Sequence, residues 1–327
     1  MRGLAAVMIV LFHYTHQYNA SYAGERGPID LGWSVSFGYA AVATFFMLSG
    51  YLAARYIYAR AMSAGNDGKP MAPGRFIVKK LKRFYPVYWV CMTLSALTLT
   101  MLFAEERVSI GQWAANLTMV SPLMGVPFVD GAYWTMQCEL LFCLIGAALM
   151  FVRRPRTIDY ILIGWIVLSM ILSFTLGVKA LKFVRIATVV PHCQGFIAGI
   201  AIWRLHKAGH GQVWMAVATL LLCVANCVLW YGPTSPDVYF LVVSAIMLYL
   251  ADRLDYLISG NNLVIRVIAW IAAISYPLYL LHEMIGFAIL HHLQGYGLNH
   301  PALLIIPATV VVFVAWLVHE QVERRIK

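Results

Sequence analysis

The sequence predicts an all-α membrane protein with about ten transmembrane helices and both termini in the cytoplasm. Of the 327 residues, 61% are hydrophobic and only 12% are charged, whereas soluble domains carry about 25% charged residues. Apolar runs long enough to cross a bilayer recur along the chain, and basic residues gather in alternate loops. Because no hydrophilic stretch is long enough for a second, soluble domain, we expect one integral-membrane domain over 1–327.

The predicted spans are the apolar runs of near-membrane length. In order, they are 3–20, 34–57, 84–104, 133–152, 158–176, 184–203, 213–231, 238–251, 264–290 and 302–319. The eighth run is short. The stretch 108–129 is semi-apolar and contains Pro122 and Pro127, so we expect an outside loop there, re-entrant or not, rather than a span.

Loop charges support this topology. With the N-terminus in the cytoplasm, nineteen of the 24 Lys and Arg residues fall in inside segments and five fall outside, as the positive-inside rule requires. Topology therefore explains most of the net charge of +10, and we expect no nucleic-acid partner. Lys179, Lys182 and Arg185 lie outside against the rule, which suggests that they face an anionic lipid headgroup or a substrate.

Arg2 and His13 lie at the two ends of the first predicted span. At about 100° per residue, their spacing is about 20° past three full turns, so both side chains share one helix face. The rise of about 16 Å carries His13 from the cytoplasmic edge to the bilayer midplane or beyond it. An imidazole at that depth is costly to leave unpaired. We therefore predict a buried base that acts inside the membrane.

Away from the ends of the predicted spans, few other ionisable residues occur; they are Glu139, His192, His282 and Glu283. By depth, Glu139 and His282 fall in the outer parts of their spans, as His13 does, so these three are predicted to converge on one outward-facing cavity. A carboxylate that orients a histidine makes the ring an effective general base. The alternative is that each residue makes an ordinary hydrogen bond between helices.

The largest basic cluster, 75–86, lies at the inner end of the third predicted span. Its members Lys80 and Arg83 are three residues apart and share a helix face. They are therefore candidates to clamp the phosphates of a cytoplasmic, nucleotide-like donor. The alternative is a cytoplasmic anchor that is attracted to anionic lipid.

Other conspicuous residues have simpler interpretations. Ser49 and Gly50 favour close helix packing over a serine nucleophile. Tyr133 and Trp134 are typical of an aromatic belt at a membrane interface. The six cysteines lie in apolar runs and form no C-x-x-C pair, so we expect neither a disulfide framework nor a zinc site. Spaced carboxylates do not accompany the histidines of the last outside loop, which favours solvated residues over a metal site; these histidines are His291, His292 and His300.

Five spaced blocks resemble the acyltransferase 3 family of integral-membrane acyltransferases, and they cover essentially the whole chain. Block 2–14 resembles the family's opening Arg and His separated by ten residues. Block 45–50 reads Phe-Phe-Met-Leu-Ser-Gly, and block 80–88 resembles an Arg-x-x-Arg pattern before Tyr-Pro. Block 133–142 resembles Trp-Ser-Leu-x-x-Glu-x-x-Phe, and block 274–282 resembles Ser-Tyr-x-x-Tyr-Leu-x-His.

The resemblance implies transfer of an acyl group, most often acetyl, from cytoplasmic acyl-CoA to a sugar hydroxyl of an envelope or exported glycan. It implies His13 as general base and Glu139 and His282 as its catalytic partners. Arg2, Lys80 and Arg83 would bind the acyl-CoA phosphates. We accordingly expect acyl-CoA, a glycan or lipid-linked sugar and membrane lipids as partners, no metal, and a location in a bacterial inner membrane.

The chain departs from the family pattern at several positions. Lys80 replaces the first Arg of Arg-x-x-Arg and lacks its bidentate fork, and Thr135 stands where the family often has Ser. No cleavable signal peptide is evident. Only Met1 precedes the opening Arg2, which leaves open whether the natural chain begins upstream.

Two other classes of function remain open from the sequence. A transporter or flippase for a sugar-containing substrate would also need intramembrane His and Glu, although no internal repeat relates the two halves of the chain. A structural subunit of a glycan-export complex would make substitutions of His13 and Glu139 silent.

Overall fold

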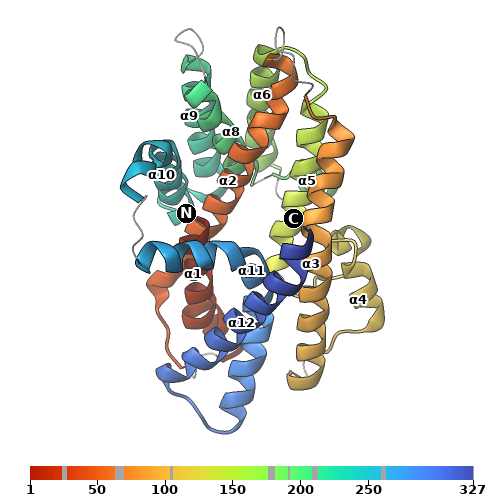
Figure 1. Ribbon diagram of the computed structural model, residues 1–327, viewed down its shortest axis with the longest axis vertical. Coiled ribbons are helices and arrows are strands. Elements are labelled where there is room, and N and C mark those ends of the chain that lie inside the picture. Colours follow the sequence, from red (N-terminus) through yellow and green to blue (C-terminus); the bar gives the residue numbers. More distant parts are fainter. Residues whose placement is uncertain are drawn as a thin grey trace. The chain divides into compact units, whose positions relative to one another are not determined.

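The part of the chain that is described is mostly helical. The computed structural model describes residues 1–23, 28–62, 70–103, 106–175, 181–190, 192–207, 213–258 and 263–326. Lys179 lies outside these residues. Within them no β-strand occurs (Figure 1), which confirms the predicted all-α class.

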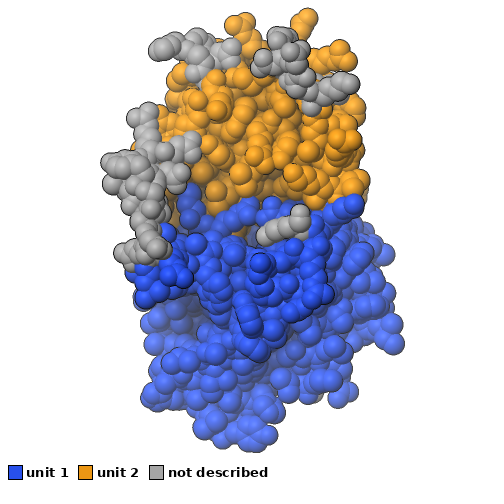
Figure 2. Space-filling view, viewed as in Figure 1, with its two compact units in different colours: residues 1–41, 81–137, 261–327 blue, residues 42–80, 138–260 orange. Residues whose placement is uncertain are grey.

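The chain divides into two compact units, which Figure 2 colours separately. Unit 1 comprises 1–41, 81–137 and 261–327, and unit 2 comprises 42–80 and 138–260. The prediction of a single domain over 1–327 stays a prediction. Three helices contribute residues to both units: α2 (Val35–Met62), α3 (Pro73–Leu102) and α5 (Trp134–Leu149).

Unit 1 also contains the two ends of the chain. Its helices are α1 (Arg2–Phe12), α4 (Ile110–Asn116), α11 (Leu263–Gly295), α12 (Ile305–Val318) and α13 (Arg324–Ile326). Wider π-helical turns form η1 (His13–Gln17), η2 (Asn19–Ala23) and η11 (His319–Glu323), and 3₁₀ turns form η4 (Gly32–Ser34), η6 (Ser121–Met124), η7 (Gly131–Tyr133) and η10 (Pro301–Leu304). Unit 2 adds α6 (Pro155–Ser173), α7 (Lys182–Ala187), α8 (Cys193–Lys207), α9 (Val213–Tyr231) and α10 (Pro236–Ile258).

Seven helical segments of the described chain are long and apolar enough to cross a membrane, so the protein is an integral membrane protein. They are Gly32–Ala59, Pro73–Leu102, Gly131–Leu149, Pro155–Ser173, Val213–Tyr231, Leu263–Gly295 and Pro301–Ile326. The count of about ten spans and the cytoplasmic termini stay predictions.

The other three predicted spans form shorter or interrupted helices. Span 3–20 becomes α1 followed by π-helical turns, and span 238–251 lies within α10. Span 184–203 is broken between α7 and α8, where Val189 has a positive φ of 58°. Val190 precedes Pro191 in the sequence, and a proline disfavours helical backbone geometry in the residue before it.

The stretch 108–129 folds as α4 and η6 rather than as a span. Asn116 is fully buried, and its side chain donates to the Gln112 and Pro127 carbonyls at 2.8 and 3.0 Å. Its Oδ1 accepts the Val129 N–H at 3.1 Å. These bonds fix the end of the segment, and therefore the position of Asp130 that follows it.

Close packing of α2 on α8 depends on two glycines in unit 2. A Cβ on Gly50 would lie 1.9 Å from the Phe196 carbonyl oxygen, and a Cβ on Gly199 would lie 1.9 Å from the Met47 carbonyl oxygen. Because both obstacles are backbone atoms, neither contact can relax by a side-chain rotation. Gly50 is therefore a packing residue, as the sequence favours.

Gly50→Ala should destabilise the protein by about 1–3 kcal/mol or more through overpacking, seen as a lower thermal-unfolding midpoint in detergent. The matched control is Gly164→Ala in α6, where nothing lies within 4 Å of the added Cβ. That variant should keep or slightly raise the midpoint, because alanine favours the helix by about 1 kcal/mol. Equal midpoints for the two variants would contradict the packing role.

Candidate active site

His13 and His282 meet inside unit 1. The His13 Nδ1 and His282 Nε2 atoms are 3.2 Å apart, and the two rings are perpendicular with centroids 4.6 Å apart. Both residues are buried, with exposed fractions of 8% and 0%. At His13 the helix changes from α to π geometry, so the Tyr18 N–H bonds to the His13 carbonyl. Isolated π turns often occur at functional sites.

The carbonyl partners determine which nitrogen of each ring carries a proton. His282 Nδ1 lies 2.7 Å from the Tyr279 carbonyl oxygen, which can only accept, so this nitrogen donates. His282 Nε2 then accepts from His13. His13 Nδ1 also lies 2.9 Å from the Ile9 carbonyl oxygen, so it donates as well. In the neutral ring, His13 Nε2 is consequently the nitrogen with a free lone pair.

One carboxyl group stands beside this basic nitrogen, and a second lies near the first. Glu283 Oε2 is 3.6 Å from His13 Nε2, and Asp130 Oδ2 accepts the N–H of Met284, the residue after Glu283, at 3.2 Å. Asp130 is 1% exposed and precedes the first residue of its membrane span. Burial, followed by the neighbouring Glu283 charge, raises the pKa of Asp130 well above its usual value.

Several hydroxyl groups hold the backbone of α11 around His282. Tyr14 donates to the His282 carbonyl at 2.7 Å, and its ring occupies the space that a Cβ on Gly286 would fill. Tyr133 donates to the Leu280 carbonyl at 3.1 Å. Thr135 donates to the Tyr279 hydroxyl at 2.9 Å. The threonine that replaces the family serine therefore still supplies a hydroxyl group here.

Glu139 lies in unit 2 with Ser49 and Lys80. Its Oε1 accepts from the Ser49 hydroxyl at 2.5 Å and lies 3.4 Å from Lys80 Nζ. Both partners of the ion pair are largely buried, at 17% and 14% side-chain exposure. The predicted role of Glu139 toward His13 stays a prediction. Within unit 1, the carboxylate beside His13 is Glu283.

The predicted donor-binding residues lie near the beginnings of two helices. Arg2 is the first residue of α1 and is half-buried. Helix α3 begins at Pro73, well before the predicted span, so the basic cluster 75–86 belongs to the helix itself. Arg83 Nε is buried and has no hydrogen-bond partner among the described residues. An orphaned guanidinium atom of this kind favours an anionic ligand.

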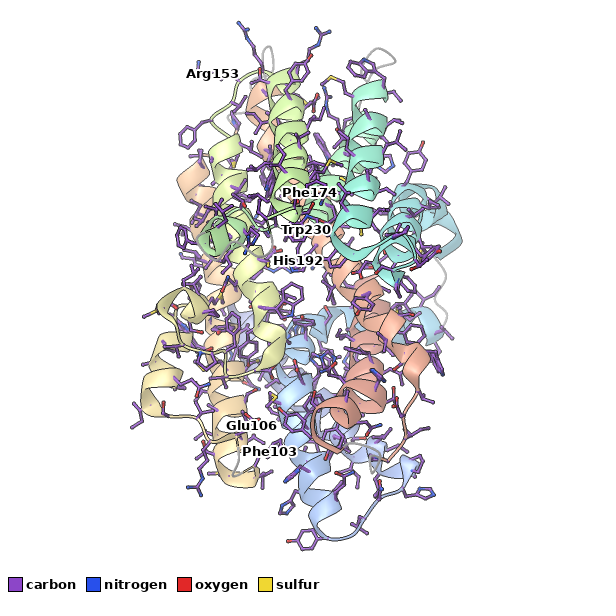
Figure 3. All side chains as sticks on the ribbon, turned by 180° about the vertical axis from the view of Figure 1, so that it is seen from behind. Phe103, Glu106, Arg153, Phe174, His192 and Trp230 are labelled. Carbon is purple, nitrogen blue, oxygen red and sulfur yellow. The ribbon has the colours of Figure 1, made fainter. Side chains whose placement is uncertain are left out.

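Three other histidines have local partners. In unit 2, His192 Nδ1 lies 3.0 Å from the Tyr231 hydroxyl, on the helix that also carries Trp230 (Figure 3). In unit 1, His291 stacks on Phe103, with ring centroids 4.3 Å apart, and Phe103 lies near Glu106 (Figure 3). His300 Nδ1 accepts the Ala302 N–H. Among the described residues, no group of three or more metal-ligating side chains occurs.

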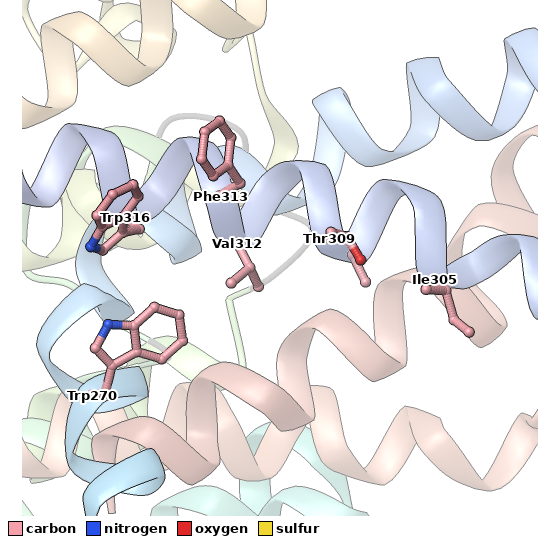
Figure 4. A pocket seen from close by; sticks show the side chains of 7 residues that line it. Trp270, Ile305, Thr309, Val312, Phe313 and Trp316 are labelled. Atoms are coloured by element: carbon pink, nitrogen blue, oxygen red, sulfur yellow. The ribbon is translucent and has the colours of Figure 1, made fainter.

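An apolar pocket of about 440 Å³ lies between α11 and α12 (Figure 4). It is lined by Trp270, Ile305, Ala308, Thr309, Val312, Phe313 and Trp316. None of these side chains titrates near neutral pH, so the pocket offers no acid–base chemistry.

Sequence reasoning found His13 and His282 but gave no role to Asp130 or Glu283. Glu283 stands out in the sequence as an acid inside an apolar run, next to His282. Asp130 falls in a presumed loop, although an Asp just before a helix is a recognisable N-terminal cap. Its Oδ1 accepts the Ala132 N–H at 2.9 Å, as a capping side chain does.

Comparison with known proteins decides the family. The model of an acyltransferase domain family, Acyl_transf_3, matches residues 1–320. The chain belongs to this family. It is also 25% identical over 202 residues to the exopolysaccharide production protein ExoZ of Rhizobium meliloti (strain 1021), a match that covers 59% of this chain and 58% of that protein. No solved structure matches the chain.

His282→Ala should lower acyl transfer by about 10²-fold or more, because the ring that packs against His13 and helps to hold its orientation is lost. His282→Gln keeps an acceptor oxygen and should retain part of the activity. The control is His292→Ala, which removes an exposed imidazole. We would measure label transfer from acyl-CoA by purified protein; equal rates for His282→Ala and His292→Ala would refute the role.

Proposed function

We propose that this protein is a membrane acyltransferase that moves a short acyl group, acetyl above all, from cytoplasmic acyl-CoA to a sugar hydroxyl of an envelope or exported glycan. The observation that carries the proposal is the buried His13–His282 pair, which leaves one basic nitrogen on the His13 ring. Membership of the acyltransferase family supplies the class of reaction. A bacterial inner membrane is the location that suits a cytoplasmic donor and an exported acceptor.

The proposed reaction uses His13 as a general base. Its Nε2 removes the proton from the sugar hydroxyl while the hydroxyl oxygen forms a bond to the thioester carbonyl carbon. The carbon–sulfur bond then breaks, and the coenzyme A thiolate takes the proton back from His13. His282 holds the Nδ1 proton of His13 in place throughout, as an orienting group does in a catalytic triad. No other proton donor is needed for the balance.

The donor is acyl-CoA, whose phosphates we assign to Arg2, Lys80 and Arg83. Two facts support this assignment. Lys80 Nζ lies 3.4 Å from Glu139 Oε1, so this carboxylate holds the ammonium group in a largely buried position. Arg83 has a buried Nε without a hydrogen-bond partner among the described residues, and a phosphate oxygen would satisfy it.

The acceptor class rests on the relative from Rhizobium meliloti, whose name records a part in exopolysaccharide production. By analogy, we propose that a polysaccharide or a lipid-linked precursor presents the hydroxyl group. Because the match covers under two thirds of that relative, the proposal is limited to this class of acceptor.

His13→Ala should abolish acyl transfer, a loss of at least about 10²-fold, because no other group in the proposed reaction accepts the hydroxyl proton. The measurement is transfer of labelled acetyl from acetyl-CoA to isolated exopolysaccharide by purified protein in detergent. Protein yield and thermal stability serve as controls for folding. Near-normal transfer by this variant would end the proposal. A wild-type protein that neither transfers nor hydrolyses acyl-CoA would favour the transporter class.

Arg83→Ala should raise the KM for acyl-CoA about tenfold, since a charge-assisted phosphate contact contributes about 1.5 kcal/mol or more. The KM for the glycan should stay unchanged. Lys82→Ala is the matched control, because Lys82 is a neighbouring base with an exposed side chain. An equal rise in KM for both variants would indicate general electrostatic attraction and contradict a specific site at Arg83.

A further inference from the structure

Asp130 and Glu283 bring two carboxyl groups into contact within unit 1. Asp130 is 1% exposed, and the side chain of Glu283 is 12% exposed. Asp130 Oδ2 accepts the N–H of Met284, the residue after Glu283, at 3.2 Å. Glu283 Oε1 in turn lies 2.5 Å from where a Cβ on Gly131, the residue after Asp130, would stand, so the two carboxyl groups lie close together. Two carboxylates at close range repel each other, which favours one shared proton. Burial adds to this, because a second negative charge would be poorly solvated.

The backbone around the two acids is built to hold them together. Asp130 accepts the Ala132 N–H with Oδ1 at 2.9 Å and the Met284 N–H with Oδ2 at 3.2 Å. It therefore ties the segment before α5 to the turn of α11 that carries Glu283. Gly131 leaves room for this approach, because a Cβ there would lie 2.5 Å from Glu283 Oε1.

We propose that Asp130 and Glu283 form an acid pair that keeps one proton, and that its remaining negative charge faces His13 and stabilises the protonated ring during acyl transfer. Glu283 is the member that lies 3.6 Å from His13 Nε2. The inference rests on the proposed function and makes both acids positioning residues. The pair's own proton stays between the two carboxyl groups, while the proton from the sugar hydroxyl goes to His13 and then to the leaving thiolate.

The titratable groups near the pair are tyrosines, a cysteine and the two histidines. Besides His13, the titratable groups that face Glu283 are Tyr22 of η2 and, on its own helix, His282. The groups that face Asp130 are Tyr14 of η1, Tyr88 and Cys91 of α3, and Tyr133 of η7. All of these are neutral at neutral pH in their ordinary forms, so the charge of the acid pair dominates the field at His13.

The sign of the pH effect follows from this charge. A carboxylate beside His13 favours the protonated ring, and only the unprotonated ring can act as a base. Activity therefore falls as the pH drops through the titration of His13. Removing the carboxylate makes protonation harder, so the acid limb of the pH profile must move to lower pH.

The experiment compares the pH dependence of kcat/KM for acyl transfer by the wild type, Glu283→Gln and Glu283→Asp. Glu283→Gln should move the acid limb to lower pH and lower the plateau about tenfold or more, because the charged intermediate is less stabilised. Glu283→Asp keeps a carboxylate and should retain much of the wild-type pH dependence of kcat/KM. The matched control is Glu323→Gln, which changes a second buried carboxylate that lies 2.7 Å from a histidine, His319, and it should leave the acid limb in place.

A second measurement detects the proton of the acid pair without an activity assay. The infrared spectrum of the wild type at neutral pH should contain a protonated carboxyl band that disappears in Asp130→Asn and persists in Glu323→Gln. An unmoved acid limb in a folded Glu283→Gln variant, or the lack of such a band, would overturn the acid pair. Failure of the wild type to transfer acyl groups would instead overturn the proposed function, while the infrared result would still decide the pair.

Discussion

A polar group buried among apolar helices must find a partner within the protein, and this constraint shapes the site. His13 Nδ1 and both nitrogens of His282 have a partner on the backbone or on the other ring. The Ile9 and Tyr279 carbonyl groups can only accept, so the protons of both rings have fixed positions. One lone pair remains on His13 Nε2, and the proposed acyl transfer needs a base of that kind.

The rest of unit 1 keeps this arrangement rigid. Tyr14 packs against Gly286 of α11 and donates to the His282 carbonyl. On the other side, Asp130 accepts the N–H of Met284, two residues after His282. The same backbone bond holds the turn that carries Glu283 beside His13 Nε2. One set of contacts thus sets both the orientation of the ring and the position of the carboxyl group beside it, as the proposed proton transfer requires.

The sequence predicts the helical class and the family because hydrophobic run length, loop charge and motif spacing are local properties. It also identifies His13 and His282, since an ionisable residue in an apolar run is rare. It misses the partnership of Asp130 with Glu283, because a contact between a capping residue and a distant helix leaves no periodic pattern. For a similar reason, the sequence does not predict the interruptions of spans 3–20 and 184–203. Hydropathy measures composition, whereas the π turn at His13 and the positive φ of Val189 are backbone features.

The central claim is that His13 carries its proton on Nδ1 and offers Nε2 as the base. Nitrogen-15 NMR of histidine-labelled protein in detergent measures this directly, with the His13 signals assigned by their loss in His13→Asn. Near neutral pH, the account predicts a ring with a protonated Nδ1 and an unprotonated Nε2. A neutral ring with the proton on Nε2, or a ring that stays doubly protonated throughout the active pH range, would contradict it.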